Sequence, residues 1–479
     1  RAWAADDPDA VTRDELVGLA DAAEGGDEGA AAELADAMAG MLEFGTAGLR
    51  GKLGGGNNRM NRAVVIRAAA GLTAYLKTLT PEPFVVVGFD ARTNSDVFAR
   101  DTAAVVVAAG GRAAILNRTM PTPVLAYAIR WLGADAGVMV TASHNPPQDN
   151  GYKVYLGDGS QIVSPVDALI AEQIAQVSSV AGVARADDGW ETLGDDVWQD
   201  YLRDAAAVVE HGAAAELSVV HTALHGVGTE TVLAAFERAG FSAPNVVESQ
   251  AQPDPAFPTV SFPNPEEPGA IDAAIELAEQ TGPDVVIAND PDADRCAAAV
   301  PGPGGWRMLR GDEVGALLGA HLLAKGSAAG VLPDSAECVF ANSIVSSRLL
   351  AAMCRAAGVR HEETLTGFKW ISRVPGLRYG YEEALGYCVD PAQVRDKDGV
   401  SAALLFAELT AGLKAGGRSV DDLLDDLARA HGVHATDAFS VRVEDLSLIG
   451  EIMARLRATP LTSVAGVDVA RADDLAQGD

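Results

Sequence analysis

Positive charge is scarce in this chain. Its 479 residues include 36 lysines and arginines against 67 aspartates and glutamates, which leaves a formal net charge of −31. A surface with this balance repels nucleic acid and anionic membranes, so we expect neither as a partner. An anionic ligand would need basic residues or a metal cation gathered at its binding site.

Cysteine and long apolar runs are also rare. The four cysteines have no C-x-x-C spacing, and no stretch approaches the roughly 18 apolar residues of a membrane span. The first ten residues lack an apolar signal core. We therefore expect buried thiols in a reducing cytoplasm, without export through a classical signal. Because no initiator Met is present and the last residues are polar, we expect a fragment of a longer chain.

The order of predicted elements indicates a repeated α/β architecture. Three times, an apolar strand leads through a polar turn into an Ala-rich amphipathic helix, beginning near Phe84, Leu217 and Cys338. This alternation predicts three similar mixed-sheet α/β domains around a central cleft, followed by the start of a fourth, smaller α+β domain. We place them at residues 1–195, 196–310, 311–430 and 431–479, with a strand over 439–443 and a helix over 448–456 in the last.

A polar loop follows a later strand in each of the three units, which is where open α/β sheets place ligands. The first loop, Thr141–Lys153, contains Ser143 and His144 followed by two prolines. Prolines stiffen such a turn, so we expect an exposed serine that suits a nucleophile. For a Ser-His pair alone, an ordinary surface turn would be the better interpretation.

The second loop places Asp290, Asp292 and Asp294 at alternate positions, followed by Arg295. Carboxylate oxygens at this spacing are hard ligands that suit Mg²⁺, with phosphate oxygens completing its coordination. The alternative is a solvated acidic turn. In the third loop, Glu382 and Glu383 lie between glycines, and such carboxylates accept hydrogen bonds from sugar hydroxyls.

Taken in order over residues 44–400, these segments resemble the active-site loops of the α-D-phosphohexomutase family, most closely its bacterial phosphoglucomutase/phosphomannomutase branch. The resemblance implies that Ser143 carries a phosphate and, with the three aspartates, binds Mg²⁺. It implies that Arg295 contacts the phosphoryl oxygens and that Glu382 reaches the sugar ring, beside Glu383. Further matching segments contribute the catalytic candidates His144, Arg50, Lys153 and Lys397 and the substrate-binding candidates Thr46, Thr366, Gly367 and Lys369.

The implied activity is the interconversion of hexose 1-phosphate and hexose 6-phosphate, with glucose or mannose as the sugar. A phosphoserine and a bisphosphorylated sugar would be intermediates, and hexose 1,6-bisphosphate would serve as activator. Arg50, Lys153 and Lys397 are candidates for stabilising charge and shuttling a proton, which for a lysine requires a lowered pKa.

Two departures from the family pattern affect these expectations. Ala384 stands where many members have a serine, so one polar contact to the sugar is absent. No Arg-Ser-Gly-Thr loop that would hold the distal phosphate follows His431. We expect that the rest of a hinged fourth domain is either disordered beyond Asp479 or deleted, and we favour disorder.

Other activities remain open on the same residues. A phosphopentomutase or a sugar-bisphosphate synthase would use the same loops. A metal-dependent sugar phosphatase would need an aspartyl nucleophile and would make the Ser143 loop redundant. A non-catalytic binder of sugar phosphates would show no turnover. The sequence predicts a small-molecule sugar phosphate as the partner and leaves the oligomeric state open.

Overall fold

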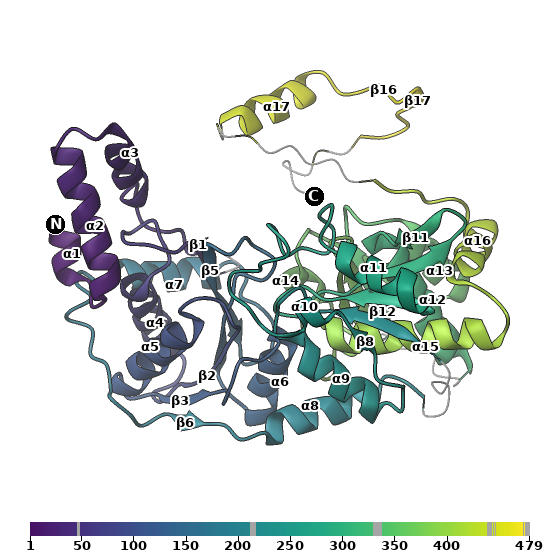
Figure 1. The fold of residues 1–479 in the computed structure, drawn as a ribbon, viewed down its shortest axis with the longest axis horizontal. Helices are drawn as coiled ribbons and strands as arrows, with labels where there is room; N and C mark the ends of the chain where they lie inside the picture. The colour runs from purple at the N-terminus through teal and green to yellow at the C-terminus, as the bar shows by residue number, and fades with distance from the viewer. Residues whose placement is uncertain are drawn as a thin grey trace. The chain divides into compact units, whose positions relative to one another are not determined.

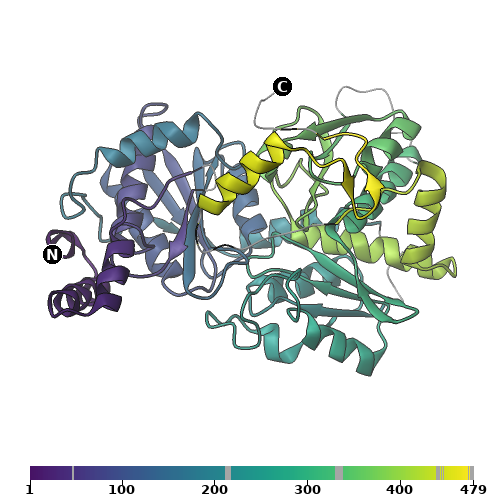
Figure 2. The ribbon, with the colours of Figure 1, turned by 90° about the horizontal axis from the view of Figure 1, so that it is seen from above.

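The computed structural model describes residues 1–45, 48–210, 217–328, 338–437, 443, 445, 447–472 and 474. It divides into two compact units, Arg1–His434 and Ala435–Asp479. The first unit contains three β-sheets, coloured purple to blue, teal, and green in Figure 2. Three helices precede the first of these sheets (Figure 1): α1 (Ala2–Asp6), α2 (Ala10–Glu24) and α3 (Glu28–Ala37).

The first sheet has six strands in the order β1-β5-β4-β2-β3-β6. Its centre is parallel, while β5 runs antiparallel to both β4 and β1. The run Phe84-Val-Val-Val is buried because both faces of the sheet are covered. Val85 and Val87 pack with α4 and α5, while Val86 packs on the opposite face with α6. The strands are β1 (Leu49–Lys52), β2 (Phe84–Phe89), β3 (Arg112–Ile115), β4 (Ala136–Val140), β5 (Asp149–Leu156) and β6 (Glu191–Thr192), and the helices are α4 (Arg62–Leu76), α5 (Ser95–Ala108), α6 (Thr122–Leu132) and α7 (Val166–Ala175).

The second sheet has five strands in the order β11-β10-β9-β7-β8. Val219 and Ile287 pack with α9 on one face, and Val220 and Val286 pack with α11 on the other. The alternation of strand side chains therefore again buries both faces. The elements are α8 (Asp196–Ala206), β7 (Val219–Thr222), α9 (Gly228–Arg238), β8 (Asn245–Val246), α10 (Glu248–Ala251), α11 (Asp272–Thr281), β9 (Val285–Ala288), β10 (Ala297–Gly302) and β11 (Gly305–Met308).

The third sheet has four strands in the order β13-β12-β14-β15, with β15 antiparallel to β14. Tyr379, Tyr381 and Tyr387 stack along one face, with ring centroids 6.2 and 6.4 Å apart. The elements are α12 (Gly311–Ala328), β12 (Val339–Ser343), α13 (Leu349–Ala357), β13 (Arg360–Thr364), α14 (Phe368–Ile371), β14 (Leu377–Glu382), β15 (Gly386–Cys388), α15 (Gly399–Ala415) and α16 (Val420–His431).

The second unit contains α17 (Ser447–Ala458) and a hairpin of β16 (Ser463–Val464) and β17 (Val467–Asp468). The helix agrees with the one predicted over 448–456, whereas most of the strand predicted over 439–443 lies outside the described residues. The prediction of mixed-sheet α/β domains is confirmed by the three sheets.

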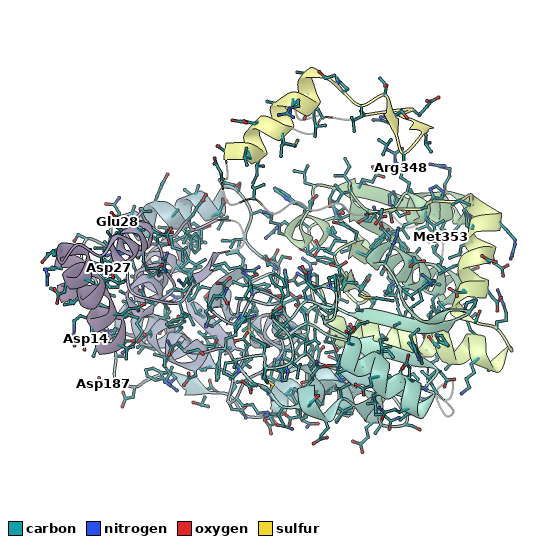
Figure 3. The ribbon with its side chains drawn as sticks, turned by 45° about the horizontal axis from the view of Figure 1, so that its top comes forward. Asp14, Asp27, Glu28, Asp187, Arg348 and Met353 are labelled. Atoms are coloured by element: carbon teal, nitrogen blue, oxygen red, sulfur yellow. The ribbon has the colours of Figure 1, made fainter. Side chains whose placement is uncertain are left out.

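Two sequence-based expectations concern the surface and the thiols. All four cysteines are buried and free. Acidic side chains are exposed on the N-terminal helices, where Figure 3 labels Asp14, Asp27 and Glu28. Within the described part of the chain, no helix is long and apolar enough to cross a membrane.

Candidate active site

Ser143 lies in the turn that joins β4 to β5. Its backbone has a φ of 51°, in the left-handed region that a non-glycine residue seldom adopts. The Ser143 backbone N–H donates to Thr141 Oγ1 at 2.8 Å, which fixes the turn locally. Ser143 is only 3% exposed, so the expectation of an exposed serine is wrong. Local sequence could not reveal this burial, because the covering residues come from the second sheet.

Arg92 holds the serine loop in place. Its Nη2 donates to the carbonyl oxygens of Ser143, at 2.6 Å, and Asn145, at 2.5 Å. Its Nη1 donates to the carbonyls of Pro146, at 2.8 Å, and Asp149, at 3.0 Å. A planar guanidinium suits four acceptors around one point, so Arg92 fixes the path of the whole loop.

Of the catalytic candidates, Arg50 contacts the serine loop and His144 belongs to it. Arg50, on β1, donates from Nη1 to Asn145 Oδ1 at 3.2 Å. His144 Nδ1 lies 3.3 Å from Ser143 Oγ. Burial and the nearby cations Arg295 and Arg50 lower the pKa of His144 to about 2, so its ring is neutral at physiological pH. Thr46, predicted to bind substrate, lies outside the described residues.

The aspartate loop follows β9 and packs directly over Ser143. Ser143 Oγ donates to Asp290 Oδ2 at 2.6 Å. All three aspartates are at most 1% exposed, and one carboxylate oxygen from each lies within 4.8 Å of the others. The alternative of a solvated acidic turn is therefore wrong. Burial, together with the charges of Asp292 and Asp294, raises the pKa of Asp290 well above its usual value.

The side chains that support this loop come from distant parts of the chain. Thr122, at the first turn of α6, donates from Oγ1 to Asp292 Oδ2 at 2.6 Å, and its backbone N–H donates to the Asp292 carbonyl at 2.9 Å. Gly226, after β7, lies so close to the loop that a Cβ there would be 2.2 Å from Pro291 Cα. Sequence reasoning missed Arg92, Thr122 and Gly226, because only the fold brings them to the loops.

Two lysines partly balance the buried negative charge. Lys153 Nζ lies 2.7 Å from Asp292 Oδ2 and 2.8 Å from Asp294 Oδ2, and Lys397 Nζ lies 3.2 Å from Asp294 Oδ2. Burial alone would lower the pKa of each lysine. The attraction of Asp292 and Asp294 nevertheless raises the pKa of Lys153, and Asp294 with Asp396 raises that of Lys397. Because a proton-shuttling lysine would need a lowered pKa, the direction of both shifts favours charge stabilisation, the other of the two roles predicted for these lysines.

The donor set of the aspartate loop fits a divalent cation. Asp292 Oδ1 and Asp294 Oδ1 are buried and have no hydrogen-bond partner. Buried carboxylate oxygens without partners are costly, and a hard cation would satisfy them. The three aspartates can therefore hold a metal ion next to Ser143 Oγ.

The glutamate loop is paired with the aspartate loop through the backbone. Arg295 and Gly386 form an antiparallel bridge, and the Cys296 N–H donates to the Leu385 carbonyl at 3.1 Å. Glu382 is the last residue of β14 and is 8% exposed. Burial raises the pKa of its carboxyl group, while the Lys397 and Arg295 cations oppose that rise.

Glu383 contacts two serines of its own sheet. Its Oε2 accepts hydrogen bonds from Ser343 Oγ at 2.7 Å and Ser346 Oγ at 2.9 Å. Ser343 is the last residue of β12 and Ser346 follows that strand, so Glu383 anchors the glutamate loop to its own sheet. The binding of a sugar by Glu382 and Glu383 stays a prediction.

The remaining predicted substrate-binding residues lie just before or within α14. Thr366 is exposed, and Gly367 has a φ of 111°, which only glycine adopts readily. Lys369 Nζ lies 5.9 Å from the centre of the Trp370 ring. Phe368 places this segment beside the site, because its ring centre lies 5.8 Å from Lys397 Nζ.

Comparison with known proteins agrees with this geometry. Models of the three α/β/α domains of phosphoglucomutase/phosphomannomutase match residues 41–181, 197–304 and 310–431. The chain belongs to the α-D-phosphohexomutase family. It is therefore an enzyme, an intramolecular phosphotransferase.

The similar proteins are named for different sugar substrates. The chain is 47% identical to a probable phosphomannomutase of Haemophilus influenzae over 86% of this chain and 84% of that protein. It is 37% identical to phosphopentomutase of Mus musculus over 89% of this chain and 73% of that protein. The solved structure of a putative phosphomannomutase from Thermus thermophilus covers 82% of this chain, and 85% of its own chain is matched, with a TM-score of 0.71 and 25% identity.

Proposed function

We propose that this enzyme interconverts the 1-phosphate and 6-phosphate of a hexose, glucose or mannose, by way of a phosphate on Ser143. The observation that supports this most is the 2.6 Å contact of Ser143 Oγ with Asp290, beside two buried carboxylate oxygens without partners. A serine hydroxyl next to a metal-binding set and several buried cations is suited to hold and release a phosphoryl group.

In the first half-reaction, a sugar hydroxyl would attack the phosphorus as the bond to Ser143 Oγ breaks. The hydroxyl proton ends on Ser143 Oγ, which leaves a free serine and a bisphosphorylated sugar. Asp290 and the His144 ring both lie near Oγ, the atom that receives a proton at the end of this step. Mg²⁺ held by the three aspartates would offset charge on the phosphoryl oxygens. Lys153 and Lys397 remain protonated and stabilise negative charge together with Arg295 and Arg50.

In the second half-reaction, hexose 1,6-bisphosphate would turn over and return its other phosphate to Ser143. Glu382 would accept hydrogen bonds from the ring hydroxyls in both orientations, with Thr366, Gly367 and Lys369 at the border of the same site. Free hexose 1,6-bisphosphate would therefore act as an activator, because it restores phosphate to Ser143.

Measurement of intact mass tests the phosphoserine. The purified enzyme, incubated with hexose 1,6-bisphosphate, is expected to carry one phosphate that Ser143→Ala removes. Ser401→Ala is the matched control, since Ser401 is another buried serine, at the first turn of α15. Phosphate retained by Ser143→Ala would overturn the assignment, and release of inorganic phosphate without isomer formation would identify a phosphatase.

A phosphopentomutase is the second candidate, because the relative from Mus musculus is 37% identical over most of this chain. Glucose, mannose and ribose 1-phosphates, compared in parallel with catalytic bisphosphate, distinguish the two by kcat/KM. The same assay would detect a sugar-bisphosphate synthase through accumulation of bisphosphate. Binding of every ligand without turnover would identify a non-catalytic binder.

A further inference from the structure

A cavity lies apart from the site described above. It has a volume of about 1000 Å³ and is bordered by α1, α4, α7 and the segment 41–44. Much of its wall is apolar and includes Trp3, Leu42, Phe44 and Ile174. Neither Ser143 nor the aspartate loop lines it, so the phosphoryl-transfer site does not account for it.

One buried cation lines this cavity without adequate partners. Arg67, on α4, has a side chain that is 10% exposed, and its Nε is buried without any hydrogen-bond partner. Its Nη1 lies at the long distance of 3.4 Å from both Met41 Sδ and Asn57 Oδ1. A buried guanidinium with five donors ordinarily finds closer acceptors.

The Asp6 carboxylate lies near Arg67 but is engaged elsewhere. Asp6 Oδ2 lies 4.0 Å from Arg67 Nη2. The Asp6 carboxylate accepts hydrogen bonds from Ser179 Oγ at 2.5 Å and from the backbone N–H groups of Val180, at 2.7 Å, and Ala181, at 2.9 Å. These three donors hold Asp6 on the turn after α7, so Asp6 stays 4.0 Å from the Arg67 guanidinium and does not partner its Nε.

We propose that this cavity binds a small organic anion with a single negative charge and an apolar body. The charge would lie on Arg67, and the body would pack against Trp3, Leu42 and Phe44. A multiply charged ligand fits less well, because Asp6 and Glu43 also line the cavity and the chain as a whole is strongly negative. A neutral apolar ligand would leave the Arg67 Nε without a partner.

The cavity wall adjoins the segment that carries Arg50. Leu42 Cδ1 would lie 3.0 Å from a Cβ on Gly51, so Leu42 packs against the residue next to Arg50. Arg50 in turn contacts Asn145 of the serine loop. An anion that packs against Leu42 would therefore be linked to Arg50 only through the contact of Leu42 with Gly51.

Calorimetric titration of the whole chain with naphthalene-2-carboxylate tests the proposal. Saturable binding is expected, and Arg67→Met should weaken it at least tenfold, because Met keeps the apolar length and removes the charge. The neutral naphthalene-2-carboxamide should bind at least tenfold more weakly than the carboxylate. Binding of equal strength to the wild type and Arg67→Met would overturn the proposal.

A second variant keeps Arg67 and removes space instead. Ala175, an exposed residue of α7 that lines the cavity, is replaced by Trp, and Ala168→Trp on the same helix outside the cavity is the control. Ala175→Trp should abolish binding, whereas Ala168→Trp should leave it unchanged. Binding that persists in Ala175→Trp would place the anion elsewhere, and no saturable binding to the wild type at millimolar concentrations would also overturn the proposal.

Discussion

Arg92 should be as important to catalysis as residues that contact substrate, although it acts only through the serine loop. It is 4% exposed, and its guanidinium donates to four carbonyls of the loop, including that of Ser143. Arg92→Lys keeps the charge but replaces a planar fork by a single ammonium with three donors. At least one carbonyl loses its partner, and the geometry of the others worsens.

The magnitude follows from those hydrogen bonds. A hydrogen bond to a charged group contributes about 1.5–3 kcal/mol, so the loss of one of the four should cost about 1.5–3 kcal/mol. Ser143 also has a left-handed backbone that costs on the order of 1–2 kcal/mol and is free to relax once its carbonyl is released. If the lost hydrogen-bond energy displaces the serine loop in the reacting complex, kcat/KM should drop about 10- to 150-fold.

The assay compares Arg92→Lys with Arg59→Lys. Arg59 is similarly buried, at 5% exposed, and is held by Asn58, Glu33 and Asp36 without contact to the serine loop. Both variants should lower Tm, but only Arg92→Lys should lower kcat/KM of the folded fraction and slow phosphorylation of Ser143. Equal losses of Tm with normal kcat/KM in Arg92→Lys would refute the reasoning.

Three further predictions concern the metal, the sugar and the packing of Gly226 against the aspartate loop. Chelation should abolish activity that Mg²⁺ restores, and Asp292→Asn should raise the Mg²⁺ concentration for half-maximal activity at least roughly tenfold, since it replaces a charged ligand; full activity in excess chelator would contradict this. Glu382→Gln should lower kcat/KM for hexose phosphates about tenfold in both directions, because a charge-assisted hydrogen bond is stronger by on the order of 1 kcal/mol, and unchanged kcat/KM for every sugar phosphate would remove Glu382 from the sugar site. Gly226→Ala should weaken Mg²⁺ binding measured by calorimetry, because its Cβ would lie 2.2 Å from Pro291 Cα, whereas Gly194→Ala, with no atom within 4 Å, should have no effect.

The sequence predicted the fold class and the positions of the polar loops more fully than it predicted what surrounds the side chains of those loops. Strands such as Phe84-Val-Val-Val and the polar loops after β4, β9 and β14 follow local rules of periodicity and turn chemistry. The proximity of Ser143 to Asp290 depends on how two sheets pack, and no local pattern contains that information. The serine was therefore expected to be exposed, although the aspartate loop covers it.

The direction of the pKa shifts of the two lysines also depends on how the sheets pack. A lysine in a site rich in arginines suggests a lowered pKa, but Lys153 and Lys397 each lie beside buried aspartates that reverse the shift. Arg92 could have been noticed, because it closes the Asp-Ala-Arg turn directly after β2. Its four acceptors lie more than 50 residues away in sequence, so its role appears only in the folded chain.

The backbone bridge between Arg295 and Gly386 has a consequence for redesign of the enzyme. Because the bridge pairs the aspartate loop and the glutamate loop in one register, a glutamate loop transplanted from a relative would change the position of the aspartates. Exchange of residues 380–387 alone should therefore disturb metal binding as well as sugar choice. The smallest unit to exchange is therefore both segments together, residues 289–296 with residues 380–387.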